Sequence, residues 1–79
     1  MRGKAALALG KLASREAVAP LGALLSHPVS NLRKEVATAL GEIGHRDALP
    51  FLIPAAEDAD PDVRKIARWS IHLIEVTPT

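Results

Sequence analysis

The sequence predicts an all-α protein folded as a right-handed α-solenoid, in which short helices stack in pairs. Three observations predict this class: the chain repeats with a period of 31 residues, apolar residues recur at helical spacing within each period, and proline and glycine mark the segment boundaries. Such helix pairs bury their apolar faces by stacking on their neighbours. We therefore treat residues 1–79 as a single repeat domain.

Composition suits this fold and excludes several function classes. Apolar residues make up 48% of the chain but aromatic residues only 3%, so the core must consist of small aliphatic side chains that allow close helix packing. The absence of cysteine excludes disulfides and Cys-based metal sites. Ten Lys and Arg against nine Asp and Glu give a formal net charge of +1, so no overall field favours nucleic acid or an acidic membrane.

Targeting signals are missing from the sequence. No apolar run approaches the ~20 residues of a membrane-spanning helix. The start of the chain imitates a secretory signal, but Lys11 interrupts the apolar region that a signal requires. We therefore expect a cytoplasmic protein that does not bind membranes.

The repeat appears as matching residues at intervals of 31. Arg2, Arg33 and Arg64 coincide. The first two copies also share Ala8 with Ala39, Leu9 with Leu40, and Gly10 with Gly41. This register divides the chain into a half repeat over 1–13 and full repeats over 14–44 and 45–76.

The first two of five predicted helices span residues 3–13 and 15–26. The first has Ala and Leu residues on one face, and the second has an apolar face that begins at Ala17 and Val18. Pro20 lies inside the second range, where it removes a hydrogen bond and should bend the helix.

The remaining helices are predicted over 30–43, 47–58 and 61–75. Their apolar residues keep the helical spacing, as in Val63, Ala67, Ser70, Ile71 and Ile74 of the last one. Residues suited to helix ends flank these ranges: the predicted N-caps are Ser30, Asp47 and Asp60, Pro61 suits the first helical turn, and Gly44 suits a helix end. Pro54 lies inside the fourth helix and should bend it.

These residues resemble a known family. Residues 60–74, with the pattern D-P-D-V-R-x-x-A-x-x-S-I-x-x-I, resemble the second helix of a HEAT-like repeat of the short type first described in phycobilisome lyases. Residues 32–44 are similar and end in A-L-G-E-I-G, while residues 16–21 and 47–52 resemble the first helix. The resemblance implies about two and a half HEAT-like repeats. It departs at residues 70–72, where Ala, Leu and Gly would be usual.

Stacking aligns equivalent residues into rows, and one predicted row is basic. It contains Arg2, Arg33 and Arg64, with Lys34, Lys65 and Arg68 beside them. Each arginine either pairs with an acidic residue of an adjoining unit or belongs to a basic ridge suited to acidic protein segments or phosphates. The acidic residues considered as pairs are Glu16, Asp47, Asp60 and Asp62. Glutamates interrupt the ridge, which argues against nucleic acid.

The last helix also has a second apolar stripe. Ile66, Trp69 and Leu73 stand where the preceding copy has Glu35, Thr38 and Glu42. The stripe either folds over the end of the array and completes the core, or it docks on another chain, which is a partner or a second copy.

Groups that imitate a chemical site do not match one closely. Residues 58–62 resemble the start of an EF-hand loop, but Val63 replaces its glycine and Trp69 replaces its bidentate glutamate. The three histidines share no metal-ligand spacing on one helix, and the serines lie in no nucleophile motif. The sequence therefore predicts no enzyme, no metal site and no cofactor.

The sequence thus predicts a non-catalytic interaction or scaffold module that binds a protein partner through its second helices, with self-association through the C-terminal helix as a further arrangement. The predicted binding residues are Arg33, Lys34, Arg64, Lys65, Arg68, Trp69 and Leu73. An alternative, implied only by the resemblance, is an accessory factor of the bilin-lyase type, against which the lack of Tyr and Cys argues. Nucleic-acid binding is the third interpretation.

Overall fold

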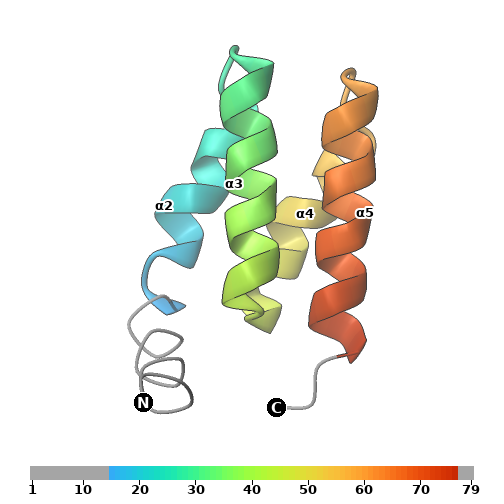
Figure 1. Ribbon diagram of the computed structural model, residues 1–79. Coiled ribbons are helices and arrows are strands. Elements are labelled where there is room, and N and C mark those ends of the chain that lie inside the picture. The colour runs from blue at the N-terminus through green and yellow to red at the C-terminus, as the bar shows by residue number, and fades with distance from the viewer. Residues whose placement is uncertain (1–14, 77–79) are drawn as a thin grey trace, which may run out of the picture.

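A computed structural model describes residues 15–76, and all regular structure in that range is helical (Figure 1). Its α-helices are α2 (Val18–Ala23), α3 (Ser30–Ile43), α4 (Leu49–Ala55) and α5 (Pro61–Val76). Short 3-10 segments, Leu24–Ser26 and Arg46–Ala48, follow α2 and precede α4. The predicted helix over 3–13, the half repeat 1–13 and Arg2 lie outside the described residues.

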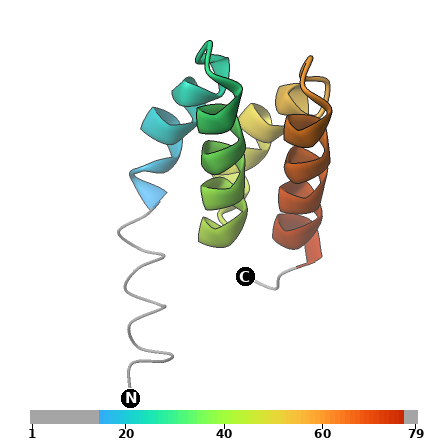
Figure 2. The same ribbon diagram turned by 45° about the horizontal axis from the view of Figure 1, so that its top comes forward.

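The helices form two layers. In Figures 1 and 2, α3 and α5 lie side by side in one layer, and α2 and α4 lie behind them in the second. The largest contact between elements joins α3 to α5, and the next largest joins α4 to α5. Each layer of the described part therefore consists of two helices, as expected for an α-solenoid.

Small aliphatic side chains fill the space between the layers. Leu40 of α3, Leu52 of α4 and Ile74 of α5 are the largest fully buried side chains. Burying each of them stabilises the fold by about 1.5–3 kcal/mol. The remaining core residues are Val18, Val36, Ala37, Ala48, Ala55, Val63 and Ala67. The predicted apolar faces therefore do form the core.

Helices α3 and α5 approach most closely at Gly41. A Cβ atom added there would lie 2.8 Å from Cβ and 3.0 Å from Cα of Ser70, closer than ordinary packing allows. The Ser70 hydroxyl donates a 2.6 Å hydrogen bond to the carbonyl of Ala37. Ser70, which departs from the usual family residue, is the one fully buried polar residue in 15–76, and this bond satisfies its hydroxyl.

Two predicted N-caps are wrong and two predicted helix ends are confirmed. Ser30 is already the first residue of α3, and Asp47 lies inside a 3-10 segment. The Asp60 carboxylate accepts the amide of Asp62 at 2.8 Å directly before α5, as an N-cap does. Gly44 ends α3 with a φ of 71°, a left-handed conformation that glycine adopts without strain.

Two histidine side chains accept backbone amides in the turns near the predicted caps Ser30 and Asp47. His27 Nδ1 accepts the amide of Val29 at 3.0 Å, and His45 Nδ1 accepts the amide of Asp47 at 3.0 Å. Each histidine thereby stabilises the turn before a helix, which accounts for these loop histidines without a metal.

Helices α2 and α4 of the second layer are shorter than the predicted ranges 15–26 and 47–58. Because α2 begins at Val18, Pro20 lies in its first turn, where an amide has no helical partner to lose, so no interior hydrogen bond is removed. Pro54 does lie inside α4, but α4 ends one residue later at Ala55. Tertiary packing therefore supports only short helices in this layer.

Candidate interaction surface

Among the described residues, the basic row begins with Arg33, whose side chain joins α3 to the loop before α5. Arg33 Nε and Nη2 each donate a 3.0 Å hydrogen bond to the carboxylate of Asp58, in the loop before α5. Both side chains are largely buried, at 15% and 12% exposure. Such a bidentate, charge-assisted pair fixes position as well as charge. Arg33 therefore holds the following repeat in place.

Arg33 also binds the loop that precedes its own helix. Its Nη1 donates to the carbonyl of His27 at 2.8 Å and to the carbonyl of Pro28 at 3.1 Å. Arg64 repeats this arrangement one period later, with Nη1 donating to the carbonyls of Asp58 at 2.7 Å and Ala59 at 3.2 Å. The two arginines therefore occupy the same place in successive repeats.

The acidic loop before α5 is held together by its own backbone and by the basic row. One Asp58 oxygen accepts the amide of Asp60 at 2.9 Å, and Lys34 Nζ lies 3.7 Å from the carboxylate of Asp62. The hydrogen bond from Arg33 lowers the pKa of Asp58, the amide of Asp60 lowers it further, and burial opposes both. The amide of Asp62 lowers the pKa of Asp60. These carboxylates are structural.

Lys65 and Arg68 lie on the exposed surface of α5. The side chain of Lys65 is exposed, and within the described part of the chain it makes no hydrogen bond or ion pair. Arg68 is also exposed, and its Nη2 makes one long contact of 3.5 Å with the carbonyl of Ala56. Both cations are accessible to a partner, unlike Arg33.

The apolar stripe of α5 divides into a packed part and an exposed part. Ile66 packs against the core and Leu73 is partly buried. Trp69 is 47% exposed, so it does not complete the core as one interpretation of the sequence required. The structure therefore brings Lys65, Arg68 and Trp69 together as an exposed set on one helix.

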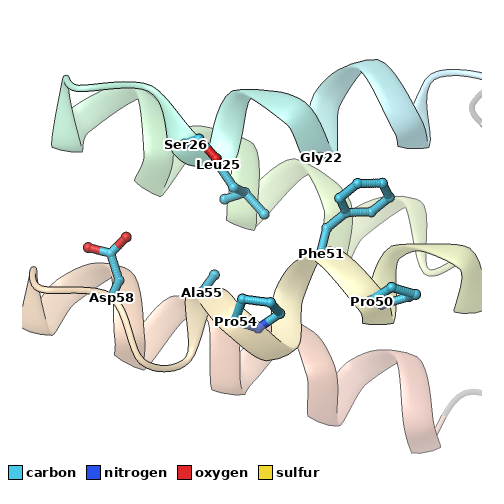
Figure 3. A pocket seen from close by; sticks show the side chains of 8 residues that line it. All are labelled: Gly22, Leu25, Ser26, Pro50, Phe51, Pro54, Ala55 and Asp58. Atoms are coloured by element: carbon cyan, nitrogen blue, oxygen red, sulfur yellow. The ribbon is translucent and has the colours of Figure 1, made fainter.

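A small hollow on the other side of the molecule was not foreseen. It lies between α2 and α4 and has a volume of about 200 Å³ (Figure 3). Phe51, Leu25 and Pro54 supply much of its apolar lining, and Asp58 lies at one end. The sequence predicts only that Pro54 bends its helix, and it contains no direct signal for this hollow.

The other missed residue is Asp58, which the sequence offered only as part of an EF-hand imitation. A signal was available, because Asp58 stands 31 positions after His27 in the loop that each arginine binds. Within residues 15–76, no three His, Cys, Asp or Glu side chains are placed to hold a metal ion. Among the helices of that same range, none has the length and apolar character needed to cross a membrane.

Comparison with known proteins agrees with the all-helical, two-layer arrangement. The sequence model of a family described as HEAT repeats matches residues 1–72. The chain belongs to the HEAT repeat family. HEAT repeats generally mediate interactions between proteins and typically serve as non-enzymatic scaffolds. Searches of curated proteins and of solved structures gave no match.

Proposed function

We propose that this HEAT repeat chain is a non-catalytic module that binds a protein partner through the layer formed by α3 and α5. The observation that carries the proposal is the exposure of Trp69 at 47% beside the exposed cations Lys65 and Arg68. Tryptophan and arginine are the residues most enriched in the energetic centres of protein interfaces. An exposed indole beside two exposed cations therefore favours a protein partner.

The seven residues predicted from the sequence contribute unequally to this surface. Arg33 is occupied by Asp58, and Lys34 lies beside Asp62, so neither has its charge fully available. We therefore place the centre of the binding surface on α5, at Arg64, Lys65, Arg68, Trp69 and Leu73.

Site-specific photo-crosslinking tests this proposal. A photoreactive amino acid replaces Lys65 on α5 in one variant and Ile53 on α4 in the other, since both positions are exposed. In cells that express the chain, position 65 should crosslink to a discrete protein and position 53 should not. Equal crosslinking patterns from both positions would contradict the proposal.

Self-association through α5 is the narrower form of the proposal. If Trp69 joins two copies, light scattering should give a mass that rises with concentration, and Trp69→Lys should restore the monomer. Ile53→Lys, at an exposed apolar position on α4, is the matched control and should leave the mass unchanged. A monomer at every concentration would remove self-association and leave binding to a different partner.

Finer features of the sequence prediction belong to the same proposal. They are the right-handed twist, the fifth helix over 3–13, the phycobilisome-lyase type of the repeats, the repeat boundaries and the cytoplasmic location. The bilin-lyase alternative is weaker, because the sequence has no Cys, no Tyr and a single Trp with which to hold a bilin. Nucleic-acid binding is the other alternative, and the net charge of +1 does not favour it.

A further inference from the structure

Arg64 repeats half of the contacts of Arg33 and lacks the other half. Both arginines donate from Nη1 to two loop carbonyls before their own helix. In Arg33 the opposite edge, Nε and Nη2, holds the carboxylate of Asp58 from the next repeat. Within residues 15–76, the same edge of Arg64 donates no hydrogen bond. The guanidinium is thus already fixed by the loop, while its carboxylate-binding edge has no partner among the described residues.

The helix surface beside Arg64 does not suit another closely stacked helix. On α3, two of the positions that meet α5 are Ala37 and Gly41, which contact Ser70 and are both buried and small. The equivalent positions on α5, 31 residues later, are Arg68 and His72, and both are exposed. These larger polar side chains would hold a helix away from α5, so an occupant of this surface must fit around them.

A second copy of the chain stacked in the repeat register is also a poor occupant. In such a stack, the residue that meets Arg64 would be His27, because it stands one period before Asp58. His27 brings no carboxylate, and its Nδ1 already accepts the amide of Val29. The chemistry of the unoccupied edge therefore points to a different protein.

We infer that Arg64 binds an Asp or Glu side chain of an acidic peptide segment in a loop or extended conformation. The carboxylate accepts hydrogen bonds from Nε and Nη2 of Arg64, as the carboxylate of Asp58 accepts them from Arg33. Lys65 and Arg68, both exposed on the same helix, receive neighbouring carboxylates of the segment, and Trp69 borders the surface. The inference rests on the proposed function and specifies the chemistry of its partner.

Fluorescence anisotropy with a defined probe tests this site. The probe is a fluorescein-labelled peptide of alternating aspartate and glycine, and the same peptide with asparagine is its control. Arg64→Lys keeps the charge but loses the bidentate geometry. We expect Arg64→Lys to weaken binding of the aspartate peptide about tenfold, equal to about 1.4 kcal/mol. Arg46→Lys, the same change at an exposed arginine before α4, is the control and should change binding less than twofold.

A second variant covers the case in which Arg64→Lys alters folding, which thermal unfolding followed by circular dichroism would show. Arg68→Gln changes an exposed side chain with one 3.5 Å contact and should also weaken peptide binding severalfold. Equal binding to wild type and to both α5 variants would overturn the inference. Tighter binding of a single-stranded oligonucleotide than of the aspartate peptide would also overturn it.

The two experiments distinguish failure of the Arg64 carboxylate site from failure of the proposed function. If position 65 crosslinks a protein but Arg64→Lys binds the aspartate peptide normally, the interaction surface stands and the carboxylate site is wrong. If Arg64→Lys selectively loses the peptide but position 65 crosslinks no protein in cells, the carboxylate site stands and the proposed function is wrong.

Discussion

Helices α3 and α5 are the same element of the repeat in two different positions, one enclosed and one at the edge of the described array. Arg33 on α3 is covered by the next repeat and holds Asp58 with two 3.0 Å hydrogen bonds. Arg64 on α5 makes the same loop contacts but has no such carboxylate within residues 15–76. The same side chain is therefore structural when a neighbour supplies an acid and available when none does.

The small residues of the two helices differ in the same way. Gly41 of α3 allows α5 to approach so closely that Ser70 of α5 fits against its backbone. His72, the equivalent residue of α5, is exposed. Close stacking thus depends on particular small residues at the enclosed interface, and the edge helix does not keep them.

Gly41→Ala should produce the largest difference between the enclosed and the edge position. The added methyl group would collide with Cβ and Cα of Ser70, which cannot move without shifting α5. We expect the free energy of unfolding to fall by about 3 kcal/mol, even though alanine favours helices. His72→Ala at the equivalent exposed position should change it by less than about 0.5 kcal/mol. Urea unfolding measures both, and equal effects would contradict the comparison.

The paired arginine substitutions should give the next largest difference. Arg33→Lys loses the bidentate contact with Asp58 inside a largely buried pair, so we expect the free energy of unfolding to fall by about 2 kcal/mol. Arg64→Lys loses no carboxylate contact and should cost clearly less. A double-mutant cycle of Arg33→Lys with Asp58→Asn measures the coupling directly. Independent, additive effects at the two positions would show that the pair does not join the repeats.

Much of this fold was predictable because repetition and helical spacing are properties of the sequence itself. The apolar positions of Val36, Leu40, Val63 and Ile74 identified the buried faces of α3 and α5 correctly. Helix ends were less predictable, since they depend on local competition. Helix α3, for example, already begins at Ser30, so Val29 and not Ser30 is its N-cap, and the His27 side chain accepts the amide of Val29.

The candidate surface was predictable only in part, because charge along a sequence does not show which charges meet. For Arg33 the structure favours the alternative of a pair with an acidic loop residue, but the acid is Asp58, two residues before the Asp60 considered from the sequence. Trp69 was equally compatible with a core or a docking role until its exposure of 47% was known. Pairing and exposure depend on how the units stack, which periodicity alone does not determine.

Removing the hydroxyl of Ser70 should have a moderate effect on the enclosed interface. Ser70→Ala loses the 2.6 Å hydrogen bond to the carbonyl of Ala37, and we expect the free energy of unfolding to fall by about 1 kcal/mol. The Ala37 carbonyl is a helix carbonyl, which limits the cost. Thr38→Ala is the control. Thr38 lies beside Ala37 on α3, and its hydroxyl bonds only to the carbonyl of Lys34 one turn earlier. A larger loss at Thr38 would contradict this assignment.

Protonation of the loop before α5 should have the smallest effect of these changes, because near neutral pH it leaves the free energy of unfolding almost unchanged. Because the pKa of Asp58 in the folded chain is below its ordinary value of 3.8, its ionised form stabilises the fold above that value. This stabilisation is lost as the pH falls through the lowered pKa, when the protonated carboxyl no longer holds Arg33.

Urea unfolding from pH 7 down to strong acid should therefore show level stability and then a decline below the ordinary pKa of 3.8. Asp58→Asn should make the decline shallower without abolishing it, because the pKa of Asp60 is also lowered, by the amide of Asp62. If Asp58→Asn kept the full acid-dependent decline of the wild type, the Arg33 contact would not be what couples the two repeats to pH. The preceding loop has His27 in place of Asp58, so the acid-sensitive contact belongs to the junction between the repeats.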